Sequence, residues 1–586
     1  LKPPEEMVRL FESLPEAISN TLRIADRCAG FNITQDLGYQ FPDFQRDRSE
    51  SADEALSRIC WEALAHRYNR DTDWVRVQAR QRLRTELELV RHHGLGGFFL
   101  VYRELLELAK EIAARIRGRE ARGRFNYPPG RGRGSSVSSI ICYLIGLSPV
   151  DPVKAKLSLG RFLNKELASI PDIDLDFPRD IREELIKAVH ERYGHDHVAM
   201  VATFPTYRLR SAVRDVGKAL GLPPGEVDRL ARLSEGRSAT TVEEEMRRLP
   251  GFQGALESPL WQHLIERARE LSGFPRHLSQ HPGGMIISSR PLVEMVPVEH
   301  SRMDGRLLCQ WDKDSCDDAR FIKIDFLSLG MLSAVEECLN LIETNGKKPV
   351  DLGRINFDDA AIYDRICAGD TVGVFQIESR AQIQMLPRTQ PRNIEELAIE
   401  IAIVRPGPIV GGAVNPYIRR REQLRRNPRA QIYYEHALLI PVLSETLGVI
   451  IYQDQVLSVC QALAGFSIGR AEALRRTMSR RRSLEAMAQF EKEFLDGAKE
   501  RGVHRRSALR IFKQILGFAE YGFPKSHAAA FAILSYQSTW LCHYHPAEFV
   551  ASVLNNQPMG FYPRDVLLKD AQRHGVLFER PDINRS

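Results

Sequence analysis

Residues 171–177 of this 586-residue chain read PDIDLDF, in which carboxylates alternate with apolar side chains. Successive side chains of a β-strand point to opposite faces, so such a strand buries one row and displays the other. The displayed row consists of Asp172, Asp174 and Asp176. Neighbouring carboxylates in this row would lie about 6.5–7 Å apart and repel one another. A divalent cation removes that repulsion, because Mg²⁺ prefers hard oxygen ligands. The stretch therefore predicts a metal-binding strand, with Asp176 the weakest candidate for a direct ligand; a solvated edge strand is the alternative.

A further acidic residue, Asp325, stands in a stretch that predicts another buried strand. Residues 322–326 read IKIDF, which places Asp325 between two apolar side chains. A charge in a buried strand needs a partner, and this carboxylate would complete a ligand set with Asp172 and Asp174. Lys323 shares a face with Asp325, so a plain Lys–Asp pair at the surface is the alternative.

A glycine- and serine-rich stretch precedes a predicted helix over 136–145. Residues 130–139 read GRGRGSSVSS. Glycine lets the backbone approach a ligand closely, and the N–H groups at a helix N-terminus bind phosphate. Arg131 and Arg133 add positive charge, whereas the absence of GKS or GKT excludes a Walker A loop. Taken alone, the stretch favours a flexible Gly/Ser loop, and the two arginines shift the interpretation toward a phosphate-binding loop.

The positive charges of the chain are clustered rather than numerous. Lys and Arg number 82 against 76 Asp and Glu, a net charge of +6, which permits a polyanionic partner without requiring one. Two arginine-rich runs, IRRREQLRRNPR at 418–429 and LRRTMSRRR at 474–482, lie where the chain reads helical. Guanidinium groups pair bidentately with phosphate, so these runs predict phosphate contacts; solvated helical faces are the alternative.

Hydrophobic periodicity predicts an α+β fold with several domains. Apolar residues at three- and four-residue spacing predict helices over most of 1–118, over 179–270 and from about 331 to 586. Residues 169–177, 281–288 and 320–330 read as strands instead. A chain of 586 residues is long for one domain, so we expect three to five.

Other features exclude several functional classes. No apolar run approaches the ~18 residues that span a bilayer, and the start of the chain does not read as a signal peptide, so we expect no membrane association. The nine Cys are dispersed without CxxC spacing, which speaks against structural zinc and predicts reduced thiols in the cytoplasm. The histidines form no HExxH pattern, and no GxSxG elbow occurs; we interpret them as structural.

Together these stretches resemble the bacterial C-family DNA polymerases, that is, the alpha subunit of DNA polymerase III and its error-prone relatives. The matching motifs occur in family order over nearly the whole chain. They are GRGSS (132–136), RFLN (161–164), PDIDLDF (171–177), AVRDVGKALG (212–221), HPGG (281–284), IKIDFLSLG (322–330), GVFQIESR (373–380), VRPGP (404–408), IYQDQV (451–456), LRRTM (474–478), GFPKSHAAAFAILSYQ (522–537) and PDIN (581–584).

The resemblance implies a palm of the polymerase-beta-like nucleotidyltransferase kind, with a helical thumb and large, mainly helical fingers. Its domain order implies linker helices and the first part of the palm over 1–203, the thumb over 204–280, the second part of the palm over 281–330 and the fingers over 331–586. We expect the chain to be a fragment that lacks the N-terminal PHP domain and the C-terminal modules of the family.

The resemblance also implies roles for individual residues. By position, Asp172, Asp174 and Asp325 match the triad that holds two catalytic Mg²⁺ ions. The residues that match the binding set for the deoxynucleoside triphosphate are Arg133, Gly134, Ser135, Arg161, Lys313, Lys323, Arg475 and Arg476. The residues expected to contact primer–template DNA are Arg208, Arg210, Arg480, Arg481 and Arg482. The reaction would be an in-line attack of the primer 3′ oxygen on the alpha phosphate.

Three stretches, RHLSQHPGG, FQIESRAQ and NNQPMGFYPRDVLLKDAQRHG, resemble the error-prone branch more than the replicative one. This branch implies translesion synthesis in the response to DNA damage. Contacts with a sliding clamp and with mutagenesis accessory proteins would run through regions that the chain does not contain. Three alternatives stay open: the catalytic core of a replicative alpha subunit, a non-catalytic DNA-binding relative, and another two-metal enzyme such as a nuclease.

Overall fold

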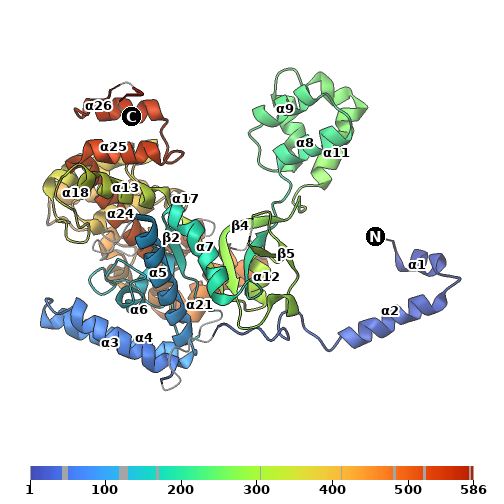
Figure 1. Ribbon diagram of the computed structural model, residues 1–586, viewed down its shortest axis with the longest axis horizontal. Coiled ribbons are helices and arrows are strands. Elements are labelled where there is room, and N and C mark those ends of the chain that lie inside the picture. Colours follow the sequence, from blue (N-terminus) through green and yellow to red (C-terminus); the bar gives the residue numbers. More distant parts are fainter. Residues whose placement is uncertain are drawn as a thin grey trace. The chain divides into compact units, whose positions relative to one another are not determined.

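A computed structural model describes residues 2–42, 50–117, 130–166, 170–303, 305–410, 412–479, 484–518, 523–579 and 582–584 (Figure 1). The chain forms two compact units, each assembled from two segments. The first unit contains residues 1–41 and 193–323, and the second contains residues 42–192 and 324–586. Both helices and strands occur in each unit, so the predicted α+β class is confirmed.

The first unit combines strands with a separate group of helices. Its strands are hydrogen-bonded in the order β4–β3–β6–β5: β3 (Val198–Thr203), β4 (Ser279–Ile287), β5 (Val298–His300) and β6 (Leu307–Cys309). β3 pairs antiparallel with β4 and parallel with β6. The helices are α1 (Pro4–Leu10), α2 (Pro15–Cys28), α8 (Leu209–Ala219), α9 (Pro224–Leu233), α10 (Val242–Arg248), α11 (Pro259–Glu270) and α12 (Lys313–Asp318).

The helices α8 to α11 have a hydrophobic core of their own. Val213 of α8, Leu230 of α9 and Leu264 of α11 are fully buried against one another's helices. In α8 the apolar residues recur every three or four positions, which places them on one face of the helix. Residues 209–270 therefore form a self-contained helical cluster.

The strand β3 corrects the prediction of continuous helix over 179–270. Its sequence, VAMVAT, is buried at every position except the last. A strand buried on both faces loses the polar–apolar alternation that marks a strand, and a short apolar run then reads equally well as helix. β1, β5 and β6 were also not predicted, because each has three residues.

The second unit holds the two strands that carry the predicted acidic residues. Its strands are hydrogen-bonded in the order β1 (Arg131–Arg133), β2 (Asp174–Phe177) and β7, which runs from Lys323 to Ser328. β1 pairs antiparallel with β2, and β2 pairs parallel with β7. Because β2 has a partner on each side, the alternative of a solvated edge strand is wrong.

Helices make up the rest of the second unit. They are α3 (Ala52–Arg67), α4 (Asp73–His92), α5 (Gly96–Arg117), α6 (Ile140–Leu144), α7 (Arg179–Tyr193), α13 (Gly330–Thr344), α14 (Ala360–Cys367), α15 (Arg380–Thr389), α16 (Ile394–Ile403), α17 (Pro406–Val410), α18 (Val414–Arg426), α19 (Ile440–Leu443), α20 (Gln453–Ala464), α21 (Ile468–Ser479), α22 (Leu484–Glu500), α23 (Arg505–Gly517), α24 (Lys525–Tyr544), α25 (Pro546–Asn555) and α26 (Arg564–Arg573).

The core of the second unit is centred on α24. This helix is buried on nearly all sides, because small residues such as Ala528 and Ala532 let neighbouring helices approach closely. α16 and α25 pack directly on it, and α13 packs on α25 (Figure 1). A second apolar cluster joins α20 to α23. α24 also contacts the turn of 3₁₀-helix at Gly134–Ser138, so this core supports the predicted phosphate-binding loop.

Most of the predicted strands and helices are present in the structure, but several of them begin or end at other residues than predicted. The strands predicted over 281–288 and 320–330 are β4 and β7, and the described residues from 331 onward contain no strand. The predicted helix over 136–145 is instead the 3₁₀-helix Gly134–Ser138 followed by α6. The strand predicted over 169–177 begins only at Asp174. Among the described residues, no helix is both long and apolar enough to cross a membrane.

Candidate active site

Three carboxylates from distant parts of the sequence converge at one end of β2. Asp174 of β2 and Asp325 of β7 are direct partners in the parallel register, so their backbones lie about 4.8 Å apart. Asp172 precedes β2 by two residues. One carboxylate oxygen from each of the three residues lies within 4.8 Å of the others. Asp325 and Lys323 are both buried, at 5% and 6% exposure, so the alternative of a surface Lys–Asp pair is wrong.

The cluster is electrostatically unfavourable as it stands. Burial, and then the charges of Asp172 and Asp325, raise the pKa of Asp174 to about 7. Arg133 lowers it in part, because its Nε lies 3.6 Å from Asp174 Oδ2. Carboxylates held this close are stabilised by a shared cation, and oxygen ligands suit a hard divalent ion.

A buried hydroxyl beside the cluster supports the fit to a hydrated cation. Tyr102 of α5 is fully buried, and among the described residues its hydroxyl oxygen has no hydrogen-bond partner. Burial, and then the charges of Asp172, Asp325 and Asp174, raise its pKa well above the usual value, so its hydroxyl stays protonated. A buried hydroxyl needs a partner, and a water molecule on a bound cation would supply one. The residues present therefore fit a divalent metal ion.

Asp176 is held by arginine rather than turned toward the other carboxylates. Arg133 Nη1 lies 3.3 Å from Asp176 Oδ1. Burial raises the pKa of Asp176 to about 6, and the charges of Arg133 and Arg131 oppose the increase. Arg133 thus contacts both Asp174 and Asp176 from the neighbouring strand β1. This arrangement agrees with the interpretation of Asp176 as the weakest candidate for a ligand.

The loop that follows β1 is fixed by the first residues of α24. Gly134 has φ = +72°, a left-handed conformation that glycine adopts without strain. Its N–H donates to Nδ1 of His527 at 3.2 Å, and the hydroxyl of Ser526 donates to its carbonyl oxygen at 2.6 Å. Ser138 closes the turn by donating from its hydroxyl to the carbonyl oxygen of Ser135. Gly134 and Ser135 therefore form a cradle with defined geometry.

His527 is a site residue that the sequence analysis treated only as structural. Its ring packs between Phe523 and Phe531, with centroids 4.5 and 4.1 Å away. Burial, and then the charges of Arg133, Arg405 and Arg161, lower its pKa to about 3. The ring is therefore neutral and can accept the hydrogen bond from Gly134. The signal was a histidine near the start of a helix that is rich in small residues.

Arg405 is another site residue that was not predicted, although it belongs to the VRPGP motif that contributes to the family resemblance. Its guanidinium lies 4.7 Å from the ring centroid of Phe523, and burial lowers its pKa. The charges of Arg133, Arg161 and Arg405 all act on the same imidazole beside the cradle. Three arginines gathered around a neutral ring create a strongly positive environment, which favours an anionic ligand.

A cavity of about 400 Å³ opens next to the cradle. Its lining includes Ser135 of the cradle and the nearby Ser138, together with Arg161 and Lys525. Two acidic side chains face these cations: Lys525 Nζ lies 2.7 Å from Glu445 Oε2, and Arg161 Nη1 lies 3.8 Å from Asp454 Oδ1. The cavity thus combines hydroxyl groups, backbone and positive charge, which is the chemistry that holds phosphate groups.

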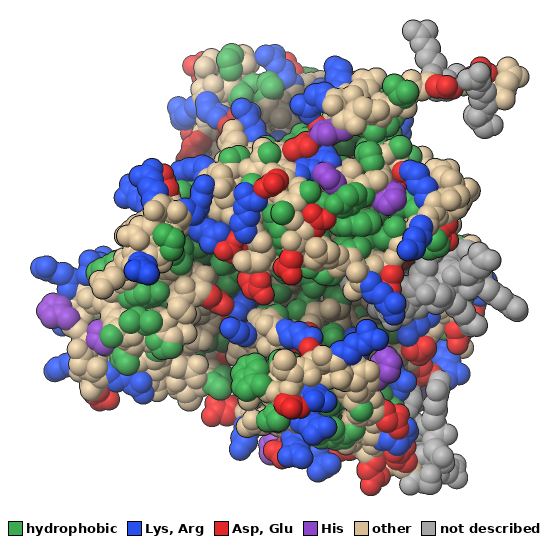
Figure 2. All heavy atoms as spheres, turned by 90° about the vertical axis from the view of Figure 1, so that its left-hand side faces the viewer, with side chains coloured by type: hydrophobic (Ala, Val, Ile, Leu, Met, Phe, Trp, Pro, Cys, Tyr) green, Lys and Arg blue, Asp and Glu red, His purple; other side chains and the backbone are tan. Residues whose placement is uncertain are grey.

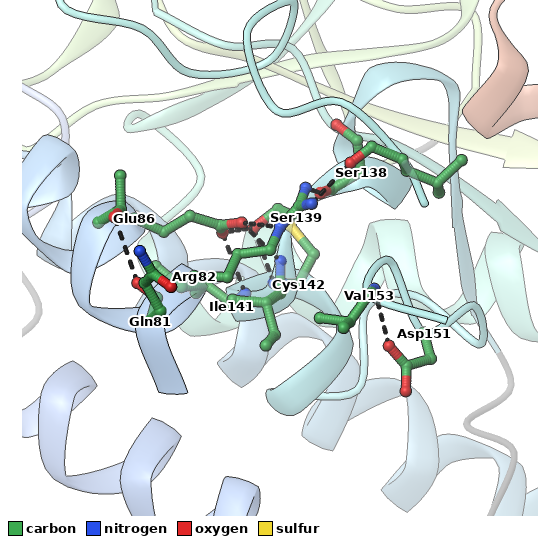
Figure 3. Close-up of polar contacts among 12 residues, drawn as sticks. Gln81, Arg82, Glu86, Ser138, Ser139, Ile141, Cys142, Asp151 and Val153 are labelled. Atoms are coloured by element: carbon green, nitrogen blue, oxygen red, sulfur yellow. Dashed lines mark hydrogen bonds and ion pairs between the residues drawn. The ribbon is translucent and has the colours of Figure 1, made fainter. Parts of the chain in front are cut away.

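The far end of the cradle is anchored by a buried carboxylate, Glu86 of α4 (Figure 3). Glu86 accepts hydrogen bonds from Ser139 Oγ at 2.7 Å and from the N–H groups of Ile140 and Ile141 at 3.0 and 3.3 Å. Arg82, one turn earlier in α4, pairs with Glu86 at 3.1 Å and also donates to the carbonyl oxygen of Ser138. The start of α6 is therefore attached to α4 by a charged group.

The remaining predicted nucleotide-binding residues lie in three places. Arg475 of α21 pairs bidentately with Glu472, at 2.9 and 2.6 Å, and its charge also acts on Arg161. Arg476 follows in the same helix, and its side chain lies outside the described part of the chain. Lys313 begins α12, and Lys323 is the buried first residue of β7; both are assigned to the first unit.

The structure places two of the five residues predicted to bind DNA and does not test their binding. Arg208 and Arg210 stand at the start of α8 and are exposed, and Arg210 donates to the carbonyl oxygen of Ser234 at 3.2 Å. Arg480, Arg481 and Arg482 lie outside the described residues. The contribution of all five arginines to DNA binding stays a prediction.

Comparison with known proteins matches nearly the whole chain to one group. The family model for the bacterial DNA polymerase III alpha NTPase domain matches residues 54–328, and the model for the bacterial DNA polymerase III alpha subunit finger domain matches residues 331–502. The chain is 40% identical to an error-prone DNA polymerase of Rhodopirellula baltica, in an alignment of 588 positions that covers all of this chain and 49% of that protein.

Two further relatives carry the same name. An error-prone DNA polymerase of Burkholderia mallei is 40% identical over all of this chain and 54% of its own length. That of Anaeromyxobacter sp. strain K is 44% identical over 87% of this chain and 44% of its own length. The chain thus spans about half the length of the curated relatives it matches.

Proposed function

Because the chain belongs to the bacterial DNA polymerase III alpha subunit family, we propose that it is a DNA-directed DNA polymerase that extends a primer 3′ end along a template. The names of its relatives favour error-prone synthesis, as in translesion synthesis during the response to DNA damage. The observation that carries the proposal is the convergence of Asp172, Asp174 and Asp325 beside a cationic glycine–serine cradle.

We assign the domains in the order that the family implies. The palm would comprise the end of 1–203 together with 281–330, the thumb would be 204–280, and the fingers would be 331–586. The separate hydrophobic core of α8 to α11 supports the thumb assignment. The purely helical character of the described residues after 331 supports the fingers assignment.

Asp172, Asp174 and Asp325 would hold two Mg²⁺ ions. Bound there, the ions would lower the pKa of the primer 3′ hydroxyl and neutralise the charge of the leaving pyrophosphate. Arg133 keeps Asp174 and Asp176 in place from the neighbouring strand and screens part of their charge. Tyr102 closes the cluster from α5 and excludes bulk water from that side.

The incoming deoxynucleoside triphosphate would bind at the cradle and its cavity. Gly134 and Ser135 offer backbone and hydroxyl donors, and Arg161 lies in the cavity wall. Arg133, Lys313, Lys323, Arg475 and Arg476 complete the set that we assign to the triphosphate. Arg475, now paired with Glu472, would exchange that carboxylate for phosphate when the nucleotide enters.

The test is primer extension by Asp174→Asn compared with Asp176→Asn. Both substitutions keep the size of the side chain and remove one negative charge from the same face of β2. Loss of a ligand should slow incorporation by ~10³-fold or more, because several kcal/mol of transition-state stabilisation are removed. Asp176→Asn should slow it far less. Near-normal extension by a correctly folded Asp174→Asn protein would defeat the proposal.

Two further measurements separate the proposal from its alternatives. Pyrophosphate release that matches nucleotide incorporation distinguishes a polymerase from a nuclease that uses a similar metal cluster, and neither signal is expected from a non-catalytic DNA-binding relative. Extension past an abasic template position distinguishes the error-prone branch from the catalytic core of a replicative subunit. The partners would include primer–template DNA and deoxynucleoside triphosphates, together with a sliding clamp and accessory proteins in the cytoplasm.

A further inference from the structure

A second and larger cavity, of about 930 Å³, lies in the second unit away from the carboxylate cluster. Its walls come from α3, α5, the end of α6 and the start of β1, together with residues 353 and 354. Figure 2 views the side of the molecule that carries α3 and α4, where Lys and Arg side chains are spread over the surface. We call this cavity the α3–α5 groove.

The α3–α5 groove has a net positive lining. Its six cationic side chains are Arg58, Arg67, Arg103, Lys110, Arg131 and Arg354. Only three carboxylates, those of Glu50, Glu62 and Glu107, line it as well. An open groove with this imbalance concentrates anions from solution.

Two of these cations are not neutralised by the carboxylates of the groove. Arg58 pairs with Glu50 at 3.0 Å, and Lys110 pairs with Glu107 at 2.8 Å. In contrast, Arg67 and Arg103 form no ion pair with any other residue in the described ranges. They project from α3 and α5, which pack against each other, so both cations belong to one wall.

Arg67 is also held in a geometry that suits a nucleobase. Its guanidinium lies 4.5 Å from the ring centroid of Tyr143, which fixes the plane of the side chain while one face remains exposed. A guanidinium stacked on an aromatic ring presents a flat surface on which a base can stack. Duplex DNA does not expose base faces, so this surface favours a single strand.

The strand β1 connects the groove to the proposed active site. Arg131 begins β1 within the groove, and Arg133 ends it beside Asp174 and the cradle. At about 3.3 Å per residue, the Cα atoms at the two ends of this strand are roughly 7 Å apart. A polymer in the groove would therefore lie within a few nucleotides of the site of nucleotidyl transfer.

We propose that the α3–α5 groove binds single-stranded DNA, with Arg67 and Arg103 on its phosphates and a base stacked on the Arg67–Tyr143 pair. The choice of DNA as the ligand rests on the proposed function, whereas the binding itself needs neither metal nor nucleotide. The groove then acts as a second DNA contact that holds an unpaired stretch of the strand near the palm.

The test uses the 586-residue chain and a fluorescently labelled dT20 oligonucleotide, without Mg²⁺ or nucleotide. Fluorescence anisotropy gives the Kd between 50 and 200 mM salt. The double variant Arg67→Ala/Arg103→Ala should bind about tenfold more weakly at low salt. Loss of two phosphate contacts should also reduce the slope of log K against log salt by about 1.4. Arg67→Glu should weaken binding as well.

The matched control is Arg84→Ala. Arg84 is exposed on the neighbouring helix α4 and lies over the ring of Trp61, but it does not line the groove. The substitution removes one of the two charges that the double variant loses, together with the same kind of aromatic contact, and its Kd and salt slope should match those of the unaltered chain. Circular dichroism of each variant checks that the fold is kept.

Three outcomes would overturn the inference. They are an unchanged Kd and salt slope in the double variant, an equal loss in Arg84→Ala, and a loss of poly-L-glutamate binding without any loss of dT20 binding. The last result would assign the groove to an acidic protein. Asp174→Asn should bind dT20 normally even though it is inactive, so failure of the groove and failure of the proposed polymerase activity are distinguishable.

Discussion

Replacement of Glu86 by alanine should loosen the cradle by several kcal/mol. The Glu86 carboxylate is fully buried and accepts from Ser139, Ile140 and Ile141, in addition to its ion pair with Arg82. Each donor left unsatisfied in the interior costs about 1–3 kcal/mol, and removal of one member of a buried ion pair costs about 3–5 kcal/mol. Water can enter the space left by the side chain, so we expect about 4 kcal/mol rather than the full sum.

Hydrogen exchange is the appropriate assay, because a chain with two compact units need not unfold in one step. The amides of Ile140 and Ile141 donate directly to Glu86, so their exchange should accelerate by about 10³-fold in Glu86→Ala, which corresponds to about 4 kcal/mol. Primer extension should fall in parallel, since Ser139 directly follows the cradle turn at Gly134–Ser138.

Two control variants make the interpretation of Glu86 specific. Glu88→Ala removes an exposed carboxylate two residues further along α4 and should change neither exchange nor activity. The double change Arg82→Met/Glu86→Leu removes both charges and should be less destabilising than Glu86→Ala, because no buried charge is left alone. If Glu86→Ala leaves the exchange of Ile140 and Ile141 unchanged, the carboxylate does not anchor α6 and the reasoning fails.

Three other outcomes follow from single sites. Burial raises the pKa of Glu400 to about 8, so the folded state holds a proton that the unfolded state releases above pH ~4.5. The free energy of unfolding should therefore fall by up to about 4 kcal/mol from pH 5 to 8. In urea titrations, Glu400→Gln should flatten this decline. Gly134→Ala should reduce stability by about 1 kcal/mol, because only the φ of +72° at this position opposes a side chain. Gly132→Ala should reduce stability more, because its Cβ would meet the Leu147 carbonyl oxygen at 2.7 Å. Equal shifts of the melting temperature in the two variants would contradict this. Of the nine thiols only Cys28 is exposed, so Ellman's reagent should modify one thiol rapidly and eight only after unfolding.

The acidic strands were predictable because their chemistry is visible in the residues. Asp174 lies in a run of alternating acidic and apolar residues, and Asp325 is a single charge in an apolar stretch. Charged side chains in strands that read as buried are unfavourable, and a structural role alone does not explain them. Local sequence could not reveal that the two residues are register partners, since that pairing depends on the path of the chain between them. The resemblance to a family supplied this link.

The missed features have physical reasons as well. β3 was not recognised because a strand buried on both faces has no alternation. Glu86 occupies a position on the buried face of α4, in line with Leu83 and Val90, so a charge at an apolar position was its signal. His527 and Arg405 act through contacts with residues more than a hundred positions away, which spacing alone does not encode. The domain limits and the DNA contacts of the arginine runs stay predictions.

The parallel pairing of β2 with β7 also has a consequence for biosynthesis. Asp174 and Asp325 are separated by the greater part of the first unit, so a ribosome adds about 150 residues after the first acid before it reaches the second. At about 5–20 residues per second, this interval lasts roughly 8–30 s. A nascent chain therefore emerges with an incomplete acidic cluster. It cannot form the full set of three carboxylates until the intervening unit has been synthesised.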